Sequence, residues 1–135
     1  MPVQLMEVAI KSRFPAEAFV FVQKGLDFTV KRLHGDLPEG EQPDPHAHPE
    51  RHVTGHQLCE GLRDFAIDQY GLLARSVLKR WGIRRSEDFG EIVFAMVEAG
   101  LMFKTDSDTL DDFRGVFDFA DAFTPPLTLA GAASN

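Results

Sequence analysis

VTGHQLCEGLRDFAIDQYGLLARSVLKRWG, residues 53 to 82, is the stretch that decides the fold. It opens with the capping-box pattern T-x-x-Q at Thr54 and Gln57, and it ends at Gly82, a residue type that commonly stops a helix. Between these signals, apolar residues recur every three or four positions, the period of a helix with one buried face: Leu58, Leu62, Phe65, Ala66, Leu73, Val77 and Trp81. The stretch predicts one long helix, or two helices that meet near Gly71.

Two helices are predicted before this stretch. Residues 15 to 34 have helical spacing and end at Gly35 after three cations, which the negative end of a helix dipole favours. Gly25 inside this helix costs about 1 kcal/mol relative to alanine, unless a close helix crossing uses the missing side chain. Residues 3 to 12 predict a shorter helix with one apolar face, formed by Val3, Met6 and Ile10.

A further helix and a change of period are predicted after this stretch. Ser86 can cap a helix that ends at Gly100. Residues 101–105 and 114–119 then read as two short strands around an acidic turn. The order of helix, turn, helix and hairpin over residues 72–119 is that of a winged-helix-like unit. The alternative is another helix, because Leu110, Phe113, Phe117, Ala120 and Phe123 are spaced at three and four.

The predicted fold class is mainly α: a single-domain helical bundle over residues 1–124 that ends in the winged-helix-like unit with one short β-hairpin. Residues 36–50 hold four prolines and predict a surface loop, and residues 125–135 predict a flexible tail. The 135-residue chain has one cysteine, no signal-peptide pattern at its start and no apolar run of membrane-spanning length. We expect a cytoplasmic protein that does not enter a membrane.

The net charge of −7 is unevenly distributed. Residues 61–85 carry six basic and two acidic side chains, whereas residues 86–123 carry ten acidic and two basic ones. Charged side chains in both halves are candidates for contacts with a partner protein: Arg75, Lys79, Arg84, Arg85, Asp106, Asp108, Asp111 and Asp112. A basic partner would suit the acidic half. Sequence-specific nucleic-acid binding is not expected, because the second helix of the helix-turn-helix, SEDFGEIVFAMVEAG, has four acids and no base.

HAHPERHVTGHQLC, residues 46 to 59, raises the question of a metal site, since imidazole and thiolate are zinc ligands. The candidate ligands are His46, His48, His52, His56 and Cys59. A face of three histidines at a spacing of four is not expected, because the capping box makes Gly55 the first helical residue. Their spacing matches no common zinc pattern, so a polar loop is the preferred interpretation and zinc binding the alternative.

The sequence gives little support for calcium binding, for a reactive cysteine or for a known enzyme motif. DSDTLDD, residues 106 to 112, lacks the glycine and the glutamate of an EF-hand loop, because Asp111 and Phe117 stand at their positions. Cys59 lies in an apolar stretch, where a buried thiol is the ordinary explanation. No phosphate-binding, dinucleotide-binding or metalloprotease motif is present. An enzyme is not favoured, and no cofactor is expected.

Several short stretches together resemble an uncharacterised family of small bacterial proteins known mainly from planctomycetes and verrucomicrobia. They are GLDFTV (25–30), RHVTG (51–55), LCEGLR (58–63), DFG (88–90), MVEAGLM (96–102), KT (104–105) and FDF (117–119). The resemblance covers roughly residues 3 to 123 and implies no activity. The sequence thus favours a small protein-binding or adaptor domain, with a zinc-binding protein or a metal-dependent enzyme as the alternative.

Overall fold

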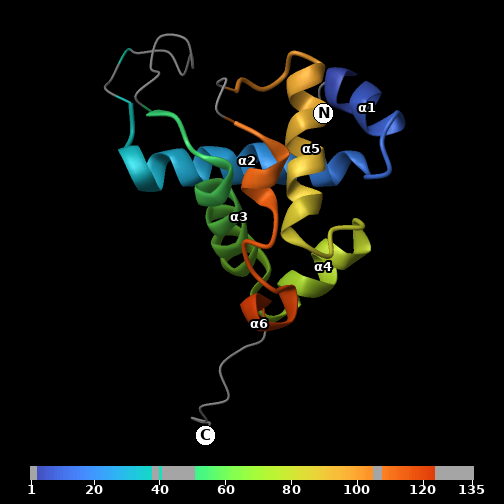
Figure 1. The fold of residues 1–135 in the computed structure, drawn as a ribbon, viewed down its shortest axis with the longest axis vertical. Coiled ribbons are helices and arrows are strands. Elements are labelled where there is room, and N and C mark those ends of the chain that lie inside the picture. Colours follow the sequence, from blue (N-terminus) through green and yellow to red (C-terminus); the bar gives the residue numbers. More distant parts are fainter. Residues whose placement is uncertain (1–2, 38–39, 41–50, 105–107, 124–135) are drawn as a thin grey trace, which may run out of the picture.

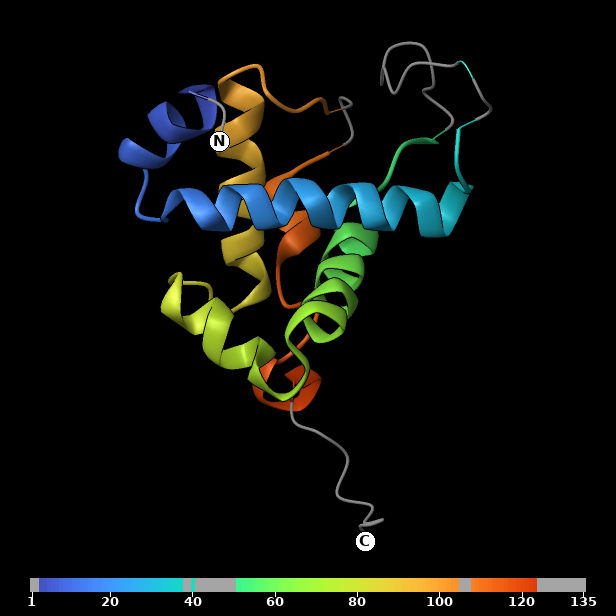
Figure 2. The same ribbon diagram turned by 180° about the vertical axis from the view of Figure 1, so that it is seen from behind.

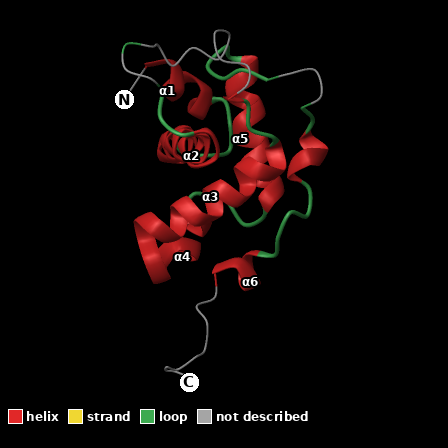
Figure 3. Ribbon diagram, turned by 90° about the vertical axis from the view of Figure 1, so that its left-hand side faces the viewer, coloured by secondary structure: helices red, strands yellow, loops and turns green. Residues whose placement is uncertain are grey.

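The structure is a computed structural model that describes residues 3–37, 40, 51–104 and 108–123. These residues form six α-helices and two 3₁₀ helices. The elements are α1 (Val3–Ile10), α2 (Ala16–His34), α3 (Gly55–Tyr70), η2 (Gly71–Leu73), α4 (Ala74–Arg80), α5 (Ser86–Glu98), η3 (Leu110–Phe113) and α6 (Phe119–Phe123). The predicted mainly α class is confirmed, and no strand occurs within these residues (Figure 3).

The long helix α2 lies across both α3 and α5, and the η3 segment lies between these two helices (Figures 1 and 2). α1 folds back on the N-terminal part of α2 and also touches α5, while α4 and α6 pack together at the far end of the molecule. The core between these helices contains the buried apolar side chains Leu5, Phe19, Val22, Leu62, Leu78, Ile83, Phe89, Ile92 and Met96.

The crossing of α2 and α3 is unusually close, and two glycines make it possible. A Cβ at Gly61 would lie 1.8 Å from Thr29 Oγ1, and a Cβ at Gly25 would lie 2.2 Å from Leu62 Cδ2. Thr29 is fully buried and donates its hydroxyl to the carbonyl of Gly25 at 2.7 Å, so its polar atom is satisfied inside the contact. Gly25 therefore serves a close helix crossing, as the sequence allowed.

The predicted helix ends agree closely with the structure. Thr54 and Gln57 form the expected capping box, with Gln57 N donating to Thr54 Oγ1 at 3.1 Å and Thr54 N donating to Gln57 Oε1 at 3.0 Å. The chain bends at Gly71, whose φ of 54° ends α3. α5 ends just before Gly100, which also has a positive φ.

Two helical details differ from the prediction. The apolar face of α1 points outward: Val3, Met6 and Ile10 are 66%, 48% and 81% exposed, whereas Leu5 is buried. The opposite strip of this helix therefore packs on the core. Ser86 is the first residue of α5 and does not cap it. Instead, the Asp88 carboxylate accepts the backbone N–H groups of Arg84 and Arg85, at 2.8 and 3.2 Å.

The buried hydroxyl of Ser86 holds the C-terminal segment against α5. It donates to the Phe113 carbonyl at 2.6 Å and accepts the Val116 N–H at 3.1 Å. The Phe113 ring fits against two glycines, because a Cβ at Gly55 or at Gly90 would approach it to within 3.0 Å. The start of α3, the start of α5 and η3 therefore meet around one phenylalanine.

The predicted hairpin over residues 101–119 is not found in the described residues of that segment. Residues 101–104 are bends and loop, η3 occupies 110–113, and α6 begins at Phe119. The attachment to Ser86 and the positive φ of Gly115 turn the chain before a strand could form. The alternative of one continuous helix is also wrong, although Phe113, Phe119 and Phe123 do face the core. Residues 81–85 join α4 to α5, and no hairpin follows α5 within the described residues.

Parts of the other predictions lie outside the described residues. These are most of the loop 36–50, the tail 125–135, and the site candidates His46, His48 and Asp106.

The glycine crossing predicts a large loss of stability for Gly61→Ala. The new Cβ would collide with Thr29, so α2 and α3 must separate, and we expect a loss of about 3 kcal/mol or more in the free energy of unfolding. Gly100→Ala is the matched control, since Gly100 has a positive φ but no atom within 4 Å of the added Cβ. It should cost only about 1 kcal/mol. Urea unfolding measures both, and equal losses would contradict the crossing.

Ser86→Ala should loosen the C-terminal segment. The change leaves the Phe113 carbonyl and the Val116 N–H without their buried partner, which costs about 1–3 kcal/mol. Hydrogen exchange of peptides from residues 110–123 should accelerate, while exchange in α2 and α3 changes less. Unchanged exchange at 110–123 would show that Ser86 does not hold this segment.

Candidate functional site

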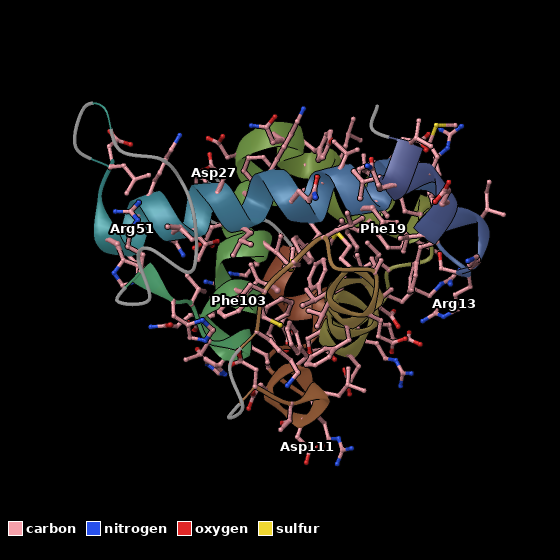
Figure 4. All side chains as sticks on the ribbon, turned by 90° about the horizontal axis from the view of Figure 1, so that it is seen from above. Arg13, Phe19, Asp27, Arg51, Phe103 and Asp111 are labelled. Atoms are coloured by element: carbon pink, nitrogen blue, oxygen red, sulfur yellow. The ribbon has the colours of Figure 1, made fainter. Side chains whose placement is uncertain are left out.

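A groove of about 710 Å³ lies beside the C-terminal half of α2, and we call it the apolar groove. Its walls come from α2, from residues 51–53, from the start of α3, from α5 and the chain that follows it, and from the end of η3. Its apolar side chains are Leu26, Val30, Leu37, Val53, Leu58, Val93, Phe94, Leu101, Met102, Phe103 and Phe113. Figure 4 shows Arg51 and Phe103 at this end of the molecule, with Arg13 at the opposite end.

Hydrogen bonds to the end of α2 hold one wall of the apolar groove. The guanidinium of Arg51 donates to the Gly35 carbonyl at 2.6 Å and to the His34 carbonyl at 3.4 Å. His34 Nε2 lies 3.1 Å from the carbonyl of His52. The last carbonyls of a helix need such donors. Residues 51–53 are thereby placed beside the last turn of α2.

A histidine–aspartate contact joins this wall to the opposite one. His52 Nε2 lies 3.2 Å from Asp108 Oδ1, and the Asp108 side chain is only 14% exposed. This pair brings together one residue proposed as a metal ligand and one proposed as a partner contact. The sequence does not reveal their proximity, because they are 56 positions apart.

Charges of both signs surround the apolar floor. Asp27 and Lys31 pair on the outer face of α2 at 3.1 Å, and Asp36, Arg51 and Lys104 also line the groove. The floor is closed by Phe113, whose ring contacts Phe94 edge to face at 6.2 Å. The groove therefore combines an apolar base with a mixed polar rim.

A second hollow, of about 250 Å³, lies between α2, α3 and the end of α4. It is lined by Phe21, Phe65, Tyr70 and Trp81, whose rings pack on one another; the Phe21–Trp81 centroids are 5.6 Å apart. Because the rings already contact each other, this hollow leaves less room for a ligand than the apolar groove does.

Cys59 is fully buried in α3, and its Sγ lies 4.0 Å from the Ser86 carbonyl. Burial, with smaller contributions from Glu87 and Glu60, raises the pKa of the thiol to about 12. A thiol with such a pKa is a poor nucleophile and a poor metal ligand at neutral pH, because both roles need the thiolate. Cys59 is thus a packing residue, as the apolar sequence around it indicates.

The described histidines are not gathered around one point. His56 is 61% exposed on α3 and has Glu60 Oε2 at 3.7 Å, whereas His52 faces Asp108. Within residues 3–37, 40, 51–104 and 108–123, no group of three or more histidine, cysteine, aspartate or glutamate residues could hold a metal ion. α3 begins at Gly55, so His52 lies before this helix and shares no helical face with His56.

The other charged candidates have different environments. Arg85 approaches Asp88 at 3.6 Å, Asp111 pairs with Arg114 at 2.9 Å, and Asp112 accepts the Thr109 N–H at the start of η3. Arg75, Lys79 and Arg84 are exposed on or just after α4. Asp111 and Asp112 therefore have local roles, while the cations of α4 face solvent away from the groove.

Sequence reasoning identified only two residues of the groove as site candidates, His52 and Asp108. The sequence indicates the other groove residues only weakly. Residues 101–103, L-M-F, follow the end of a helix, and their pattern predicts a strand. In the structure this segment instead covers the side of the groove, and Phe103 is 44% exposed.

Comparison of the chain with protein-family models, with curated proteins and with solved structures gave no significant match in any of the three. The family resemblance stays a prediction, and function has to be argued from the structure. No helix among the described residues has the length and apolar character needed to cross a membrane.

The raised pKa of Cys59 predicts a pH-dependent contribution to stability. In the unfolded chain the thiol ionises near its ordinary value of 9.0, but in the folded chain only near 12. Above about pH 9 the unfolded state therefore binds fewer protons, and the free energy of unfolding falls as pH rises.

Urea unfolding of the natural chain and of Cys59→Ala at pH 8 and pH 10 isolates this effect. The stability advantage of the natural chain should shrink by about 1 kcal/mol between the two, since each pH unit is worth at most about 1.4 kcal/mol. An advantage that stays constant would contradict a protonated thiol.

Proposed function

We propose that this chain is a small protein-binding domain that holds an apolar segment of a partner protein in the apolar groove. The observation that carries the proposal is the apolar floor, whose members Leu26, Val30 and Met102 remain partly accessible between rigid helices. Burying such side chains against a partner is favourable, at about 25 cal/mol per Å² of apolar surface removed from water.

The rim supports a peptide-like occupant. Asp27, Lys31, Asp36 and Arg51 surround the floor with both signs of charge. A peptide carries apolar side chains and polar groups in close alternation, so it can fill the floor and contact the rim together. Rim charges of this kind orient a partner more than they add affinity.

An adaptor role agrees with the chemistry of the other candidates. The thiol is protonated and buried, and the described histidines form no metal cluster. The helix α5 carries the acids Glu87, Asp88 and Glu91 in its N-terminal part, which does not suit contact with DNA bases. The single cysteine fits a reducing compartment such as the cytoplasm.

Selection from a displayed library of random peptides tests the proposal. We expect the enriched peptides to share two or three large apolar residues that fill the groove. Phe103→Glu should weaken their binding at least about tenfold, because it places a charge at the apolar wall. Fluorescence anisotropy with labelled copies of the enriched peptides measures the change.

Ile67→Glu is the matched control. Ile67 is 43% exposed and Phe103 44%, but Ile67 lies in the C-terminal part of α3 and does not line the groove. Binding should be unchanged in this variant. Equal weakening by both substitutions, or a library that yields no binding peptide, would refute the groove as a peptide site.

A further inference from the structure

We propose that the outer surface of α4 is a second docking surface, separate from the apolar groove, for an acidic segment of a partner protein that carries apolar side chains. The surface consists of Leu72 and Leu73 of η2 and of four cations, and we call it the basic face of α4. The cations are Arg75, Lys79 and Arg80 of α4, and Arg84 of the turn between α4 and α5.

The positive charge of this face is not neutralised by the described part of the chain. All four cations are exposed, and none of them forms an ion pair with any described residue. Arg85 is excluded from the face because it approaches the buried Asp88. Four like charges this close repel each other, so an anionic partner relieves that repulsion as it binds.

Two exposed leucines lie beside the cations, at the N-terminal end of α4. Leu72 and Leu73 are 76% and 65% exposed in the 3₁₀ turn that leads into α4. Leu72 is three residues before Arg75, and Leu73 is seven before Arg80, so the leucines continue rows of helical neighbours. The face thus presents apolar and cationic groups side by side, and the occupant must satisfy both.

An acidic protein segment fits these requirements better than a nucleic acid does. A phosphate backbone has no apolar surface to cover the leucines. The neighbouring helix α6 packs against α4, and Asp121 of this helix and Asp118 just before it are exposed. The whole chain has a net charge of −7. These carboxylates repel a long polyanion, while a short segment can remain on the cations.

A labelled peptide that forms an amphipathic helix, with leucines on one face and glutamates on the rest, is the probe. A matched peptide has glutamines in place of the glutamates. By fluorescence anisotropy at physiological salt, the acidic peptide should bind more tightly than the glutamine peptide. Its affinity should fall as salt is raised, because salt screens exposed charges. No binding of the acidic peptide would overturn the proposal.

Variants assign the binding to the surface. Arg75→Glu with Lys79→Glu should weaken the acidic peptide at least about tenfold, and Leu72→Ser with Leu73→Ser should weaken it as well. Lys11→Glu with Lys24→Glu makes the same change in net charge at exposed positions of another surface. This control variant should bind the acidic peptide as the natural chain does. An equal loss of affinity in the control would show that net charge alone causes the weakening.

Three further outcomes would overturn the assignment. Loss of binding in Phe103→Glu would place the peptide in the apolar groove, so the two surfaces are tested separately. Tighter binding of a DNA duplex or of phosphatidylserine vesicles, lost in the double arginine–lysine variant, would assign the face to those ligands. Self-association in sedimentation experiments, lost in the same variant, would make a second copy of this chain the occupant.

Discussion

The close approach of α2 and α3 at Gly25 and Gly61 sets the position of everything else. Before the crossing, α2 is buried through Ala18, Phe19 and Val22, and after it the same helix extends beyond the core. Its next apolar positions, Leu26 and Val30, therefore lie over the start of α3 without being covered. The apolar groove is a direct consequence of where two glycines allow the helices to cross, rather than of a separate binding element.

The second constraint is the pair of hydrogen bonds that the Ser86 hydroxyl forms with residues far along the chain. This hydroxyl fixes residues 113 and 116, so Phe113 is held between the starts of α3 and α5 and closes the groove floor. The contact of His52 with Asp108 then joins the two walls. Each of these bonds links residues far apart in the sequence. The site is therefore rigid only if the long-range packing is complete.

Local signals were reliable where the responsible interaction is itself local. The capping box of Thr54, the stop at Gly35 and the bend at Gly71 depend on neighbouring residues, and the sequence predicted them. The prediction of a hairpin was wrong because Ser86, which is far from that segment in the sequence, determines the path of the segment. The start of α3 at Gly55, which the capping box predicts, separates His52 from His56 as expected. The groove could not be predicted, since its residues come together only through the glycine crossing.

The net charge of the chain also does not indicate which charged side chains of the surface are unpaired. The chain is acidic, which suggests a basic partner for its C-terminal half. In the structure, however, Asp88, Asp108 and Asp112 are used by donors within the chain. The cations of α4 have no such use among the described residues. A charge already paired in the fold gains little from a partner, whereas an exposed, unpaired one can contribute to steering and specificity. The uncompensated charge, and not the total, is what a partner would meet.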